Sequence, residues 1–360
     1  MRVLLSGYYG FGNLGDEALL EVIVKQLRTR FPAWDVEVLS ASPEQTSAQL
    51  GVAATPRWNM NDVREAIRRA DVVLSGGGGL LQSSTSLRSV VYYAGILREA
   101  IRLKRKTMIF AQSIGPLDSL GKFVVRSLCK GVTRATVRDG RSKVLLHQLL
   151  PGTPVEQTAD PVFLYDLDLD TADLAREGLD GTPYAVFSVR KVGALKEGVA
   201  MLARVADRLA EKHGVRVAFL PLGGASDAEV STTIIRACKS APMLLPECTL
   251  ERAAAIIRGA RVVVGMRLHA LIIAARFGVP FLAIPYDPKV ASLLDDLAYP
   301  LPPLWIPGKG APDTATADGL VDRLMSQRGD LSALLETKSA EIRASAARNF
   351  DVLDELMHES

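Results

Sequence analysis

One arginine and one histidine stand between a predicted core strand and a predicted core helix. Residues 261–266 (RVVVGM) have the apolar run of a buried strand, residues 270–278 (ALIIAARFG) have the pattern of a buried helix, and Arg267 and His269 lie between them. A charge at such a position costs free energy unless an opposite charge pairs with it. Arginine binds carboxylate or phosphate with a fixed fork of donors, and a helix N-terminus also favours anions. The stretch therefore predicts a site in which an anionic ligand supplies the missing partner.

Other polar residues end predicted strands in the same half of the chain. Arg190 and Lys191 end one strand, and Tyr286 ends another. A lone arginine or histidine is most often structural. Arg190, Arg267 and His269 are all expected at the carboxyl edge of one sheet, however, and this convergence favours a shared anion site. Lys191 and Tyr286 are further candidates for it.

A glycine-rich segment follows the first predicted strand. Residues 7–20 (GYYGFGNLGDEALL) lead into a helix, and the glycines, with Gly12 and Asn13 among the candidates, let the backbone approach a ligand closely. The spacing is not that of a dinucleotide-binding loop. Asp16 and Glu17 would oppose a phosphate there, and they suit binding or deprotonating a sugar hydroxyl. The alternative for Asp16 is a helix N-cap.

A second glycine-rich segment, residues 75–89 (SGGGGLLQSSTSLRS), also joins a strand to a helix. Its glycines, including Gly77 and Gly78, precede Gln82 and a group of hydroxyl residues that includes Ser86. This composition predicts a polar surface for polyol recognition. The alternative is a flexible turn in which Ser86 or a neighbour caps the helix.

The elements that position these residues alternate between strand and helix along most of the chain. This pattern predicts an α/β protein with parallel sheets covered on both faces, in two Rossmann-like domains that face a cleft in a GT-B-like arrangement. Ligands of such sheets lie beyond the carboxyl ends of the strands. The predicted divisions are an N-terminal domain (1–165), a linker (166–182), a second domain (183–312) and a C-terminal helical extension (313–360).

Composition narrows the classes of function. The chain has 360 residues, 48% of them hydrophobic, and a net charge of +3, which is too small to favour a nucleic-acid partner. The three cysteines form no CxxC pair, which argues against zinc or disulfides and favours a reducing cytosol. The four histidines are scattered and no carboxylate cluster stands out, so we predict no metal and no cofactor.

No segment has the length and apolarity of a membrane span or the features of a secretory signal, so a cytoplasmic location is expected. Residues 98–106 (REAIRLKRK) are locally basic. These cations can stabilise the end of a helix through its dipole, or they can contact an anionic membrane surface at the inner face of the plasma membrane.

Several motifs, in order from residue 6 to about residue 290, resemble those of CsaB-type polysaccharide pyruvyltransferases: SGYYGFGNLGDEALL, SGGGGLLQ, AQSIGP, ADPVF and GMRLHALIIAA with the later YDPKV. The resemblance implies transfer of the enolpyruvyl group of phosphoenolpyruvate to a glycan sugar, with formation of a cyclic ketal and release of phosphate. The implied acceptor is an N-acetylmannosamine-type residue of a lipid-linked secondary cell-wall polymer. Such ketals serve as attachment points for S-layer proteins.

The resemblance also implies roles for individual residues. Arg267 and His269 become the phosphoenolpyruvate site together with Arg190, and Asp16 and Glu17 lie on the acceptor side. The sequence departs from the family pattern at Ser83, where an aspartate is frequent, and at residues 191–192, where Pro-Trp is frequent.

The chemistry needs a general acid at the alkene carbon and a base at the sugar hydroxyls. We expect His269 to be the acid and Asp16 or Glu17 the base. Two other functions fit the same pattern: a nucleotide-sugar glycosyltransferase of cell-envelope polysaccharide synthesis, and a non-catalytic binder of sugar phosphates.

Overall fold

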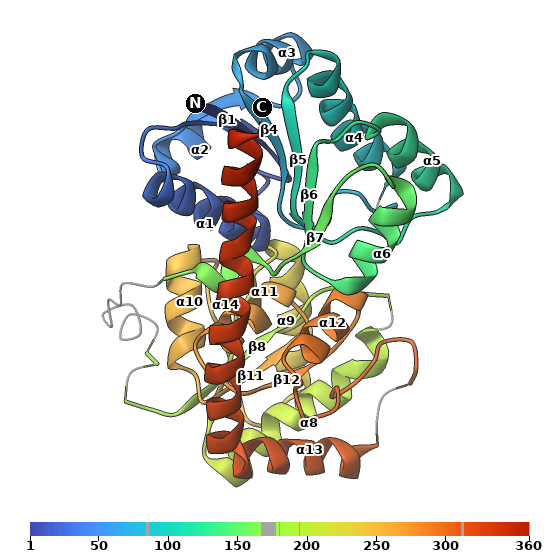
Figure 1. Ribbon diagram of the computed structural model, residues 1–360. Coiled ribbons are helices and arrows are strands. Elements are labelled where there is room, and N and C mark those ends of the chain that lie inside the picture. Colours follow the sequence, from blue (N-terminus) through green and yellow to red (C-terminus); the bar gives the residue numbers. More distant parts are fainter. Residues whose placement is uncertain (84–85, 167–177, 180, 194, 311–312, 360) are drawn as a thin grey trace. The chain divides into compact units, whose positions relative to one another are not determined.

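The structure is a computed structural model that describes residues 1–83, 86–166, 178–179, 181–193, 195–310 and 313–359 (Figure 1), with the side chains of 195–197 left out. Its contacts divide the chain into two compact units. Unit 1 comprises Met1–Leu164 and Ile342–Ser360, and unit 2 comprises Tyr165–Glu341. Most of the predicted linker, residues 166–182, lies outside the described residues. The predicted C-terminal extension is shared between the two units, because its first helix and a half belong to unit 2 and its last turns to unit 1.

Unit 1 is built on a seven-stranded parallel sheet with the order β3-β2-β1-β4-β5-β6-β7. The strands are β1 (Arg2–Ser6), β2 (Asp35–Ser40), β3 (Ala53–Pro56), β4 (Val72–Gly76), β5 (Lys106–Gln112), β6 (Arg134–Val137) and β7 (Val155–Gln157). The helices are α1 (Leu14–Arg30), α2 (Pro43–Leu50), α3 (Met60–Arg69), α4 (Leu87–Arg102), α5 (Ser119–Leu128), α6 (Gly140–Leu149) and the short 3-10 helix η1 (Pro161–Leu164).

Unit 2 is built on a five-stranded parallel sheet with the order β10-β9-β8-β11-β12. The strands are β8 (Tyr184–Ser188), β9 (Arg216–Phe219), β10 (Met243–Leu244), β11 (Val262–Gly265) and β12 (Phe281–Ala283). The helices are α8 (Leu195–His213), α9 (Ala225–Ala237), α10 (Leu250–Gly259), α11 (Leu268–Arg276), α12 (Pro288–Asp296), α13 (Thr314–Ser326) and the start of α14 (Arg328–His358).

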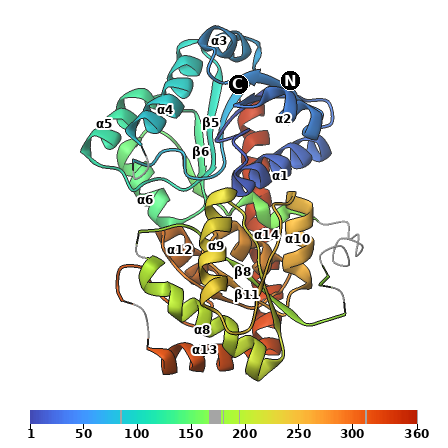
Figure 2. The same ribbon diagram turned by 180° about the vertical axis from the view of Figure 1, so that it is seen from behind.

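The central strands form because their sequences are nearly continuous apolar runs, which only a sheet covered on both faces can bury. All five residues of β4 and all five of β8 are buried, and so are all four of β11. Helices pack on both faces of each sheet (Figures 1 and 2). The predicted α/β class, with two parallel-sheet units and helices at the C-terminal end, is confirmed.

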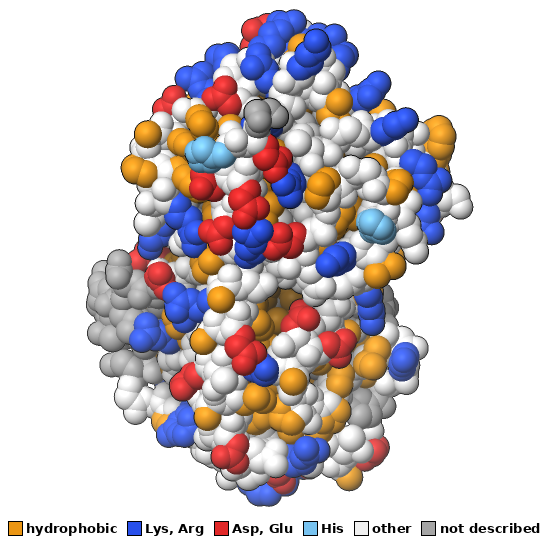
Figure 3. Space-filling view, viewed as in Figure 1, with side chains coloured by type: hydrophobic (Ala, Val, Ile, Leu, Met, Phe, Trp, Pro, Cys, Tyr) orange, Lys and Arg blue, Asp and Glu red, His pale blue; other side chains and the backbone are white. Residues whose placement is uncertain are grey.

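The last turns of α14 are fixed to unit 1 by polar contacts. The buried amide of Asn349 donates to the carbonyl of Ala159 (2.9 Å) and accepts from the hydroxyl of Thr158 (2.7 Å). The Lys106 ammonium donates to the carbonyls of Leu356 (2.9 Å) and Glu359 (2.6 Å) at the end of the helix. Figure 3 shows acidic and basic side chains intermingled over this part of unit 1.

The basic stretch 98–106 therefore has partners within the protein. Lys106 binds the C-terminal carbonyls of α14, and Arg102 at the end of α4 forms an ion pair with Glu99 (2.6 Å). Both contacts agree with the reading of these cations as stabilisers of helix ends. Among the described helices, none combines the length and the apolarity needed to cross a membrane.

Candidate functional site

The candidate residues of each unit lie where the strand order reverses. In unit 1 the chain runs outward in opposite directions from β1 and β4, and in unit 2 from β8 and β11. A crevice opens beyond the carboxyl ends of the strands at such a point, and open α/β sheets bind their ligands there. The loop after β1 contains Gly12 and Asn13, the loop after β4 contains Gly77 and Gly78, and Arg190 and Arg267 follow β8 and β11.

Arg267 is held by a carboxylate from the preceding part of unit 2. Its Nε and Nη2 donate to the two oxygens of Asp227 at 2.7 Å and 2.6 Å, and the Asp227 side chain is completely buried. Bidentate pairs of this kind are among the strong charge-assisted contacts in proteins. The expectation that a ligand alone would pair with Arg267 is therefore wrong, because Asp227 already supplies a negative charge.

Gly223 makes room for this pair. A Cβ atom at position 223 would lie 1.8 Å from Nη2 of Arg267 and 2.8 Å from Oδ2 of Asp227. Asp227 lies in the first turn of α9, whose N-cap is Gly224 and which has no side-chain cap. The arginine can therefore lie flat against the turn that leads into α9.

The N-terminus of α11 lies directly beside Arg267, because Arg267 is itself the N-cap residue and its side chain makes no capping bond. The N-cap side chain therefore leaves the first amides of the helix uncapped, and such amides favour an anion. Within the described part of the chain, Nη1 of Arg267 makes no hydrogen bond, so one guanidinium nitrogen is left to bind a ligand. His269 is half-buried in the first helical turn rather than ahead of the helix.

Arg190 is oriented by Tyr286. Its Nη1 donates to the Tyr286 hydroxyl at 2.7 Å, and its guanidinium carbon lies 4.6 Å from the centre of the same ring. Among the described residues, no carboxylate pairs with Arg190, so its charge is uncompensated. Lys191 differs from it, because its side chain is 64% exposed and its ammonium forms a surface ion pair with Glu229 at 3.2 Å. Arg190 and Tyr286 are thus in contact with each other, and Lys191 contacts solvent.

In unit 1, the carboxylate of Glu17 binds the backbone of the glycine-rich loop after β1. Its Oε1 accepts from the amides of Gly10 (2.9 Å) and Gly12 (3.3 Å). Burial raises the pKa of Glu17, and the bonds from these amides partly oppose the rise. Gly12 has φ +72°, which only glycine adopts readily. Asn13, and not Asp16, caps α1, since its side chain accepts from the Gly15 amide at 3.2 Å.

Asp16 faces the loop after β4. A Cβ at Gly78 would lie 2.9 Å from Oδ1 of Asp16, so a glycine at that position lets the carboxylate approach the loop backbone. Gly77 and Gly78 both have positive φ, +67° and +73°. Ser86 caps α4 by accepting from the Arg88 amide at 3.1 Å, as the alternative for this segment predicted. Gln82 is half-buried in the same loop, and residues 84–85 lie outside the described residues.

Two groups of residues were missed by the sequence analysis. Asp227 was not among the predicted site residues, although an acidic residue in the first turn of a helix after two glycines was a usable signal. Arg57 is buried among aromatic rings, including those of Phe11 and Trp58, each centred 4.9 Å from its guanidinium carbon. The aromatic residues of the GYYGF stretch could have indicated an aromatic cluster at this position.

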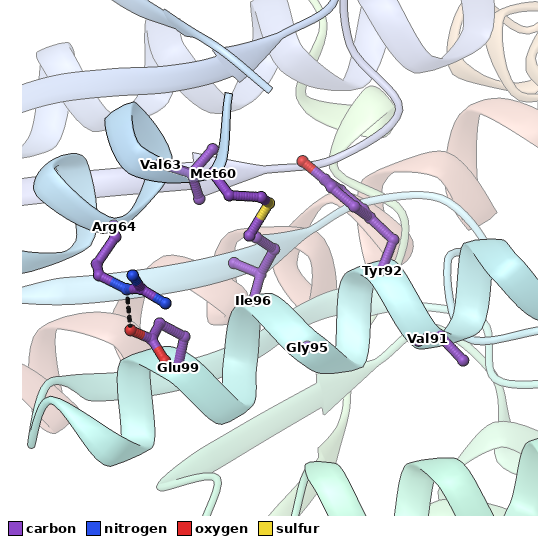
Figure 4. Close-up of a pocket in the computed structure, with 8 residues that line it drawn as sticks. All are labelled: Met60, Val63, Arg64, Val91, Tyr92, Gly95, Ile96 and Glu99. Carbon is purple, nitrogen blue, oxygen red and sulfur yellow. Dashed lines mark hydrogen bonds and ion pairs between the residues drawn. The ribbon is translucent and has the colours of Figure 1, made fainter. Parts of the chain in front are cut away.

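Unit 1 also contains a cavity of about 290 Å³ between α3 and α4 (Figure 4). Its lining is mainly apolar, and the Arg64–Glu99 ion pair (2.7 Å) closes one side. The cavity lies apart from the candidate carboxylates and shares Tyr92 with the aromatic cluster. Among the described residues, no three histidine, cysteine or acidic side chains are grouped as a metal ion would require.

The chain matches a family model by its sequence, and it shares its fold with several solved structures. A family model described as polysaccharide pyruvyl transferase matches residues 13–288. No curated protein sequence matches the chain.

Several solved structures share its fold over their whole length. UDP-GlcNAc 2-epimerase from Methanocaldococcus jannaschii has a TM-score of 0.69 at 9% identity, covering 99% of this chain and 100% of the other. Anabaena Alr3699/HepE in complex with UDP has a TM-score of 0.65 at 11% identity, covering 99% of each chain. The S. aureus MnaA–UDP co-structure has a TM-score of 0.65 at 10% identity, covering 100% of this chain and 99% of the other. At these identities the similarity shows the common GT-B-type fold alone.

Proposed function

The chain belongs to the polysaccharide pyruvyl transferase family, and from this premise we propose that it transfers the enolpyruvyl group of phosphoenolpyruvate to a glycan sugar, forming a cyclic pyruvate ketal and releasing phosphate. The observation that carries the proposal is the donor site in unit 2. Among the residues that the structure describes, an arginine with one unused nitrogen adjoins a helix N-terminus that its own N-cap side chain leaves uncapped, and a second arginine without a carboxylate partner follows the neighbouring strand.

Phosphoenolpyruvate carries a carboxylate and a phosphate on one small alkene, so it needs two cationic contacts in a fixed relation. Arg267, locked by Asp227, offers Nη1 and the adjacent amides of α11 to one anionic group. Arg190, locked by Tyr286, offers the second cation. Arginines held in this way lose little conformational entropy on binding, and a fixed donor geometry favours a reactive pose.

The chemical steps need one acid and one base. His269 in the first turn of α11 donates a proton to C3 of the alkene, and a sugar hydroxyl attacks C2. The C–O bond to phosphate breaks, phosphate leaves with the bonding electrons, and a second hydroxyl closes the ketal at C2. Asp16 is the proposed base that takes the hydroxyl protons, because Glu17 uses its oxygen to hold Gly10 and Gly12. Acid–base groups of this kind typically contribute about 10²–10⁴-fold each.

The proposed acceptor is an N-acetylmannosamine-type sugar of a lipid-linked secondary cell-wall polymer, modified at the inner face of the plasma membrane. The GDE and SGGGGLLQ motifs support this assignment through their resemblance to CsaB-type enzymes. The acceptor contacts are expected from Gly12 and Asn13, and from Gly77, Gly78 and Gln82. The product would carry a new negative charge suited to binding S-layer proteins.

Calorimetric titration with phosphoenolpyruvate, and separately with a uridine diphosphate sugar, tests the proposal. Wild type should bind phosphoenolpyruvate. Arg267→Ala should lose about 10- to 100-fold in affinity, as expected for a charged hydrogen-bond donor. Arg267→Lys keeps a charge beside Asp227 without the fork of donors and separates loss of binding from loss of folding. Arg258→Ala is the matched control, because Arg258 is an exposed arginine on α10 of the same unit.

One alternative is a nucleotide-sugar glycosyltransferase, which the UDP complexes among the structural neighbours favour. Binding of the nucleotide sugar without binding of phosphoenolpyruvate would support this alternative and refute the pyruvyl transfer. Binding of phosphoenolpyruvate without phosphate release in the presence of any glycan acceptor would support a non-catalytic binder.

A further inference from the structure

Three aromatic side chains are exposed together at the carboxyl edge of the unit 1 sheet. Tyr8 and Phe11 follow β1, Trp58 follows β3, and their exposed fractions are 40%, 39% and 65%. The Phe11 ring stacks on Tyr8 with centroids 4.1 Å apart and meets Trp58 edge-on at 6.2 Å. We call these three residues the aromatic platform. Large apolar side chains that stay exposed as a group typically mark a binding surface.

A buried arginine fixes the rings from behind. Arg57 is 3% exposed, and its guanidinium carbon lies 4.9 Å from the ring centres of both Phe11 and Trp58. Its nitrogens donate to the Gly7 carbonyl (2.7 Å) and to the Tyr93 hydroxyl (3.1 Å). A cation placed between rings and held by hydrogen bonds restricts their movement. The platform is therefore preorganised, and binding on it costs little side-chain entropy.

The loop that carries Tyr8 and Phe11 is held on three further sides. The Tyr9 hydroxyl donates to the Gly76 carbonyl (2.7 Å) at the end of β4, and the Ser42 hydroxyl donates to the Gly10 carbonyl (2.9 Å). Glu17 accepts from the Gly10 amide (2.9 Å). A loop held by three neighbouring elements presents its side chains in one geometry, as a binding site requires.

The platform lies on the loop that leads to the carboxylate that we assign to the acceptor side. Phe11 stands between Gly10 and Gly12, whose amides donate to Glu17 (2.9 Å and 3.3 Å), and Asp16 precedes Glu17 in the first turn of α1. Asp16 also lies close enough to Gly78 that a Cβ there would be 2.9 Å from its Oδ1. A ligand stacked on the exposed side of the platform would therefore lie near the loop that leads to an acceptor for hydroxyl protons.

We propose that the aromatic platform is the stacking subsite for a pyranose ring of the acceptor glycan, an assignment that rests on the proposed function. A pyranose has an apolar face of C–H bonds and an edge of hydroxyls. The electron-rich face of an aromatic ring binds the C–H face of the sugar, and a neighbouring carboxylate binds its hydroxyl groups. The cavity between α3 and α4 has different chemistry, because Met60, Val63 and Ile96 line it with aliphatic carbon (Figure 4).

The test compares variants that change only the exposed rings. The probe is the methyl glycoside of a disaccharide that ends in N-acetylmannosamine, and KM is measured for this probe and for phosphoenolpyruvate. Phe11→Ala and Trp58→Ala should each raise the KM for the glycoside about three- to tenfold and leave the KM for phosphoenolpyruvate unchanged. Trp58→Phe should recover most of the loss, because it restores an aromatic face. Trp34→Ala is the matched control, since Trp34 stacks on Phe31 at the same 4.1 Å centroid distance at another place in unit 1.

The outcomes separate this proposal from the proposed function. An unchanged glycoside KM in both alanine variants, with normal turnover, would overturn the platform and leave the pyruvyl transfer intact. If wild type shows no turnover, a titration with the glycoside alone, followed by Trp58 fluorescence, still tests whether the platform binds the sugar. A change in emission that is absent from Trp58→Phe supports the platform without the transfer. A response to uridine diphosphate and none to the glycoside would assign the rings to a nucleobase and overturn the proposal.

Discussion

Gly223→Ala gives the most direct test of how the donor site is built. The new methyl carbon would lie 1.8 Å from Nη2 and 2.5 Å from Cζ of Arg267. Ordinary contact between carbon and nitrogen begins near 3.4 Å, so the guanidinium has to retreat by about 1.6 Å. Gly223 does not have a positive φ, and alanine therefore causes no backbone strain of its own. Any effect should arise from the displaced arginine.

The size of the effect follows from what the displacement breaks. The pair between Arg267 and Asp227 has side chains 17% and 0% exposed, so the aspartate loses a partner that water does not replace. Breaking a buried ion pair typically costs ~3–5 kcal/mol, and we expect about 2–4 kcal/mol here because the arginine can keep part of the contact. For catalysis, a misplacement of about 1 Å typically costs about 100-fold. We expect kcat/KM for phosphoenolpyruvate to fall by that order.

The assay is phosphate release at limiting phosphoenolpyruvate, combined with thermal unfolding. Gly223→Ala should lower the melting temperature by roughly 5–15 °C, given the usual entropy of unfolding for a domain of this size. Gly319→Ala is the control on the same unit. Gly319 lies in α13 with no heavy atom within 4 Å of its added Cβ, so alanine should raise stability by about 0.5–1 kcal/mol and leave the kinetics unchanged.

Wild-type affinity for phosphoenolpyruvate in a folded Gly223→Ala protein would refute the reasoning. It would mean that the guanidinium has room to move without loss of binding, and that Arg267 does not contact the donor. A loss of stability with unchanged kcat/KM would confirm the ion pair but remove Arg267 from the proposed donor site.

Three other changes test separate parts of the structure. His269→Ala should lower kcat at saturating phosphoenolpyruvate by at least about tenfold, and a smaller loss would end its assignment as the acid. Glu17→Gln should become less stable relative to wild type as the pH falls. Because the native pKa of Glu17 is raised, protonation of Glu17 stabilises the wild type fully below the ordinary glutamate pKa, and this stabilisation is lost as the pH rises through the native pKa. Urea unfolding between pH 4 and pH 8 measures the difference in the free energy of unfolding. Asp322→Asn should lower stability at pH 7, because hydrogen bonds from Arg208, and then from Lys212 and His213, lower the native pKa of Asp322. The difference should shrink progressively as the pH falls from the ordinary aspartate pKa toward the lowered native one, and a difference that stays constant over this acid range would contradict the ion-pair explanation.

The central architecture was predictable because apolar runs and helix periodicity repeat with little interruption. The elements that the pattern missed are short or polar. β3 (AATP) has one buried residue, and β7 (VEQ) at the sheet edge has none. α2 (PEQTSAQL) buries only Thr46, so it lacks an apolar face. α12 begins at Pro288, directly after its N-cap Asp287, and buries only Val290 and Leu293.

The site was predictable as a set of strand ends but not as a set of contacts. Alternating strands and helices predict a parallel sheet, and in such a sheet Arg190 and Arg267 follow neighbouring strand ends if β8 and β11 pair, as they do. The partner of Arg267 lies 40 residues earlier, on the helix after β9, and the order β9-β8-β11 has to be known before that contact can be inferred. A helix cap depends only on residues that are close in sequence. The side chains of Asn13 and Ser86 each accept from an amide two residues further along the chain.

In the proposed reaction, the ion pair would also let one cation be rigid and still release phosphate. A free, fully charged arginine at an uncapped helix N-terminus would bind phosphate strongly in every state. Asp227 neutralises part of that charge at contact distance, in a position that no ligand can displace, since its side chain is completely buried. Most of the uncompensated charge then comes from Arg190, whose only bonded partner in the described structure is the neutral Tyr286 hydroxyl. In the proposed reaction, Arg267 therefore fixes the geometry of the donor, while Arg190 sets most of its affinity.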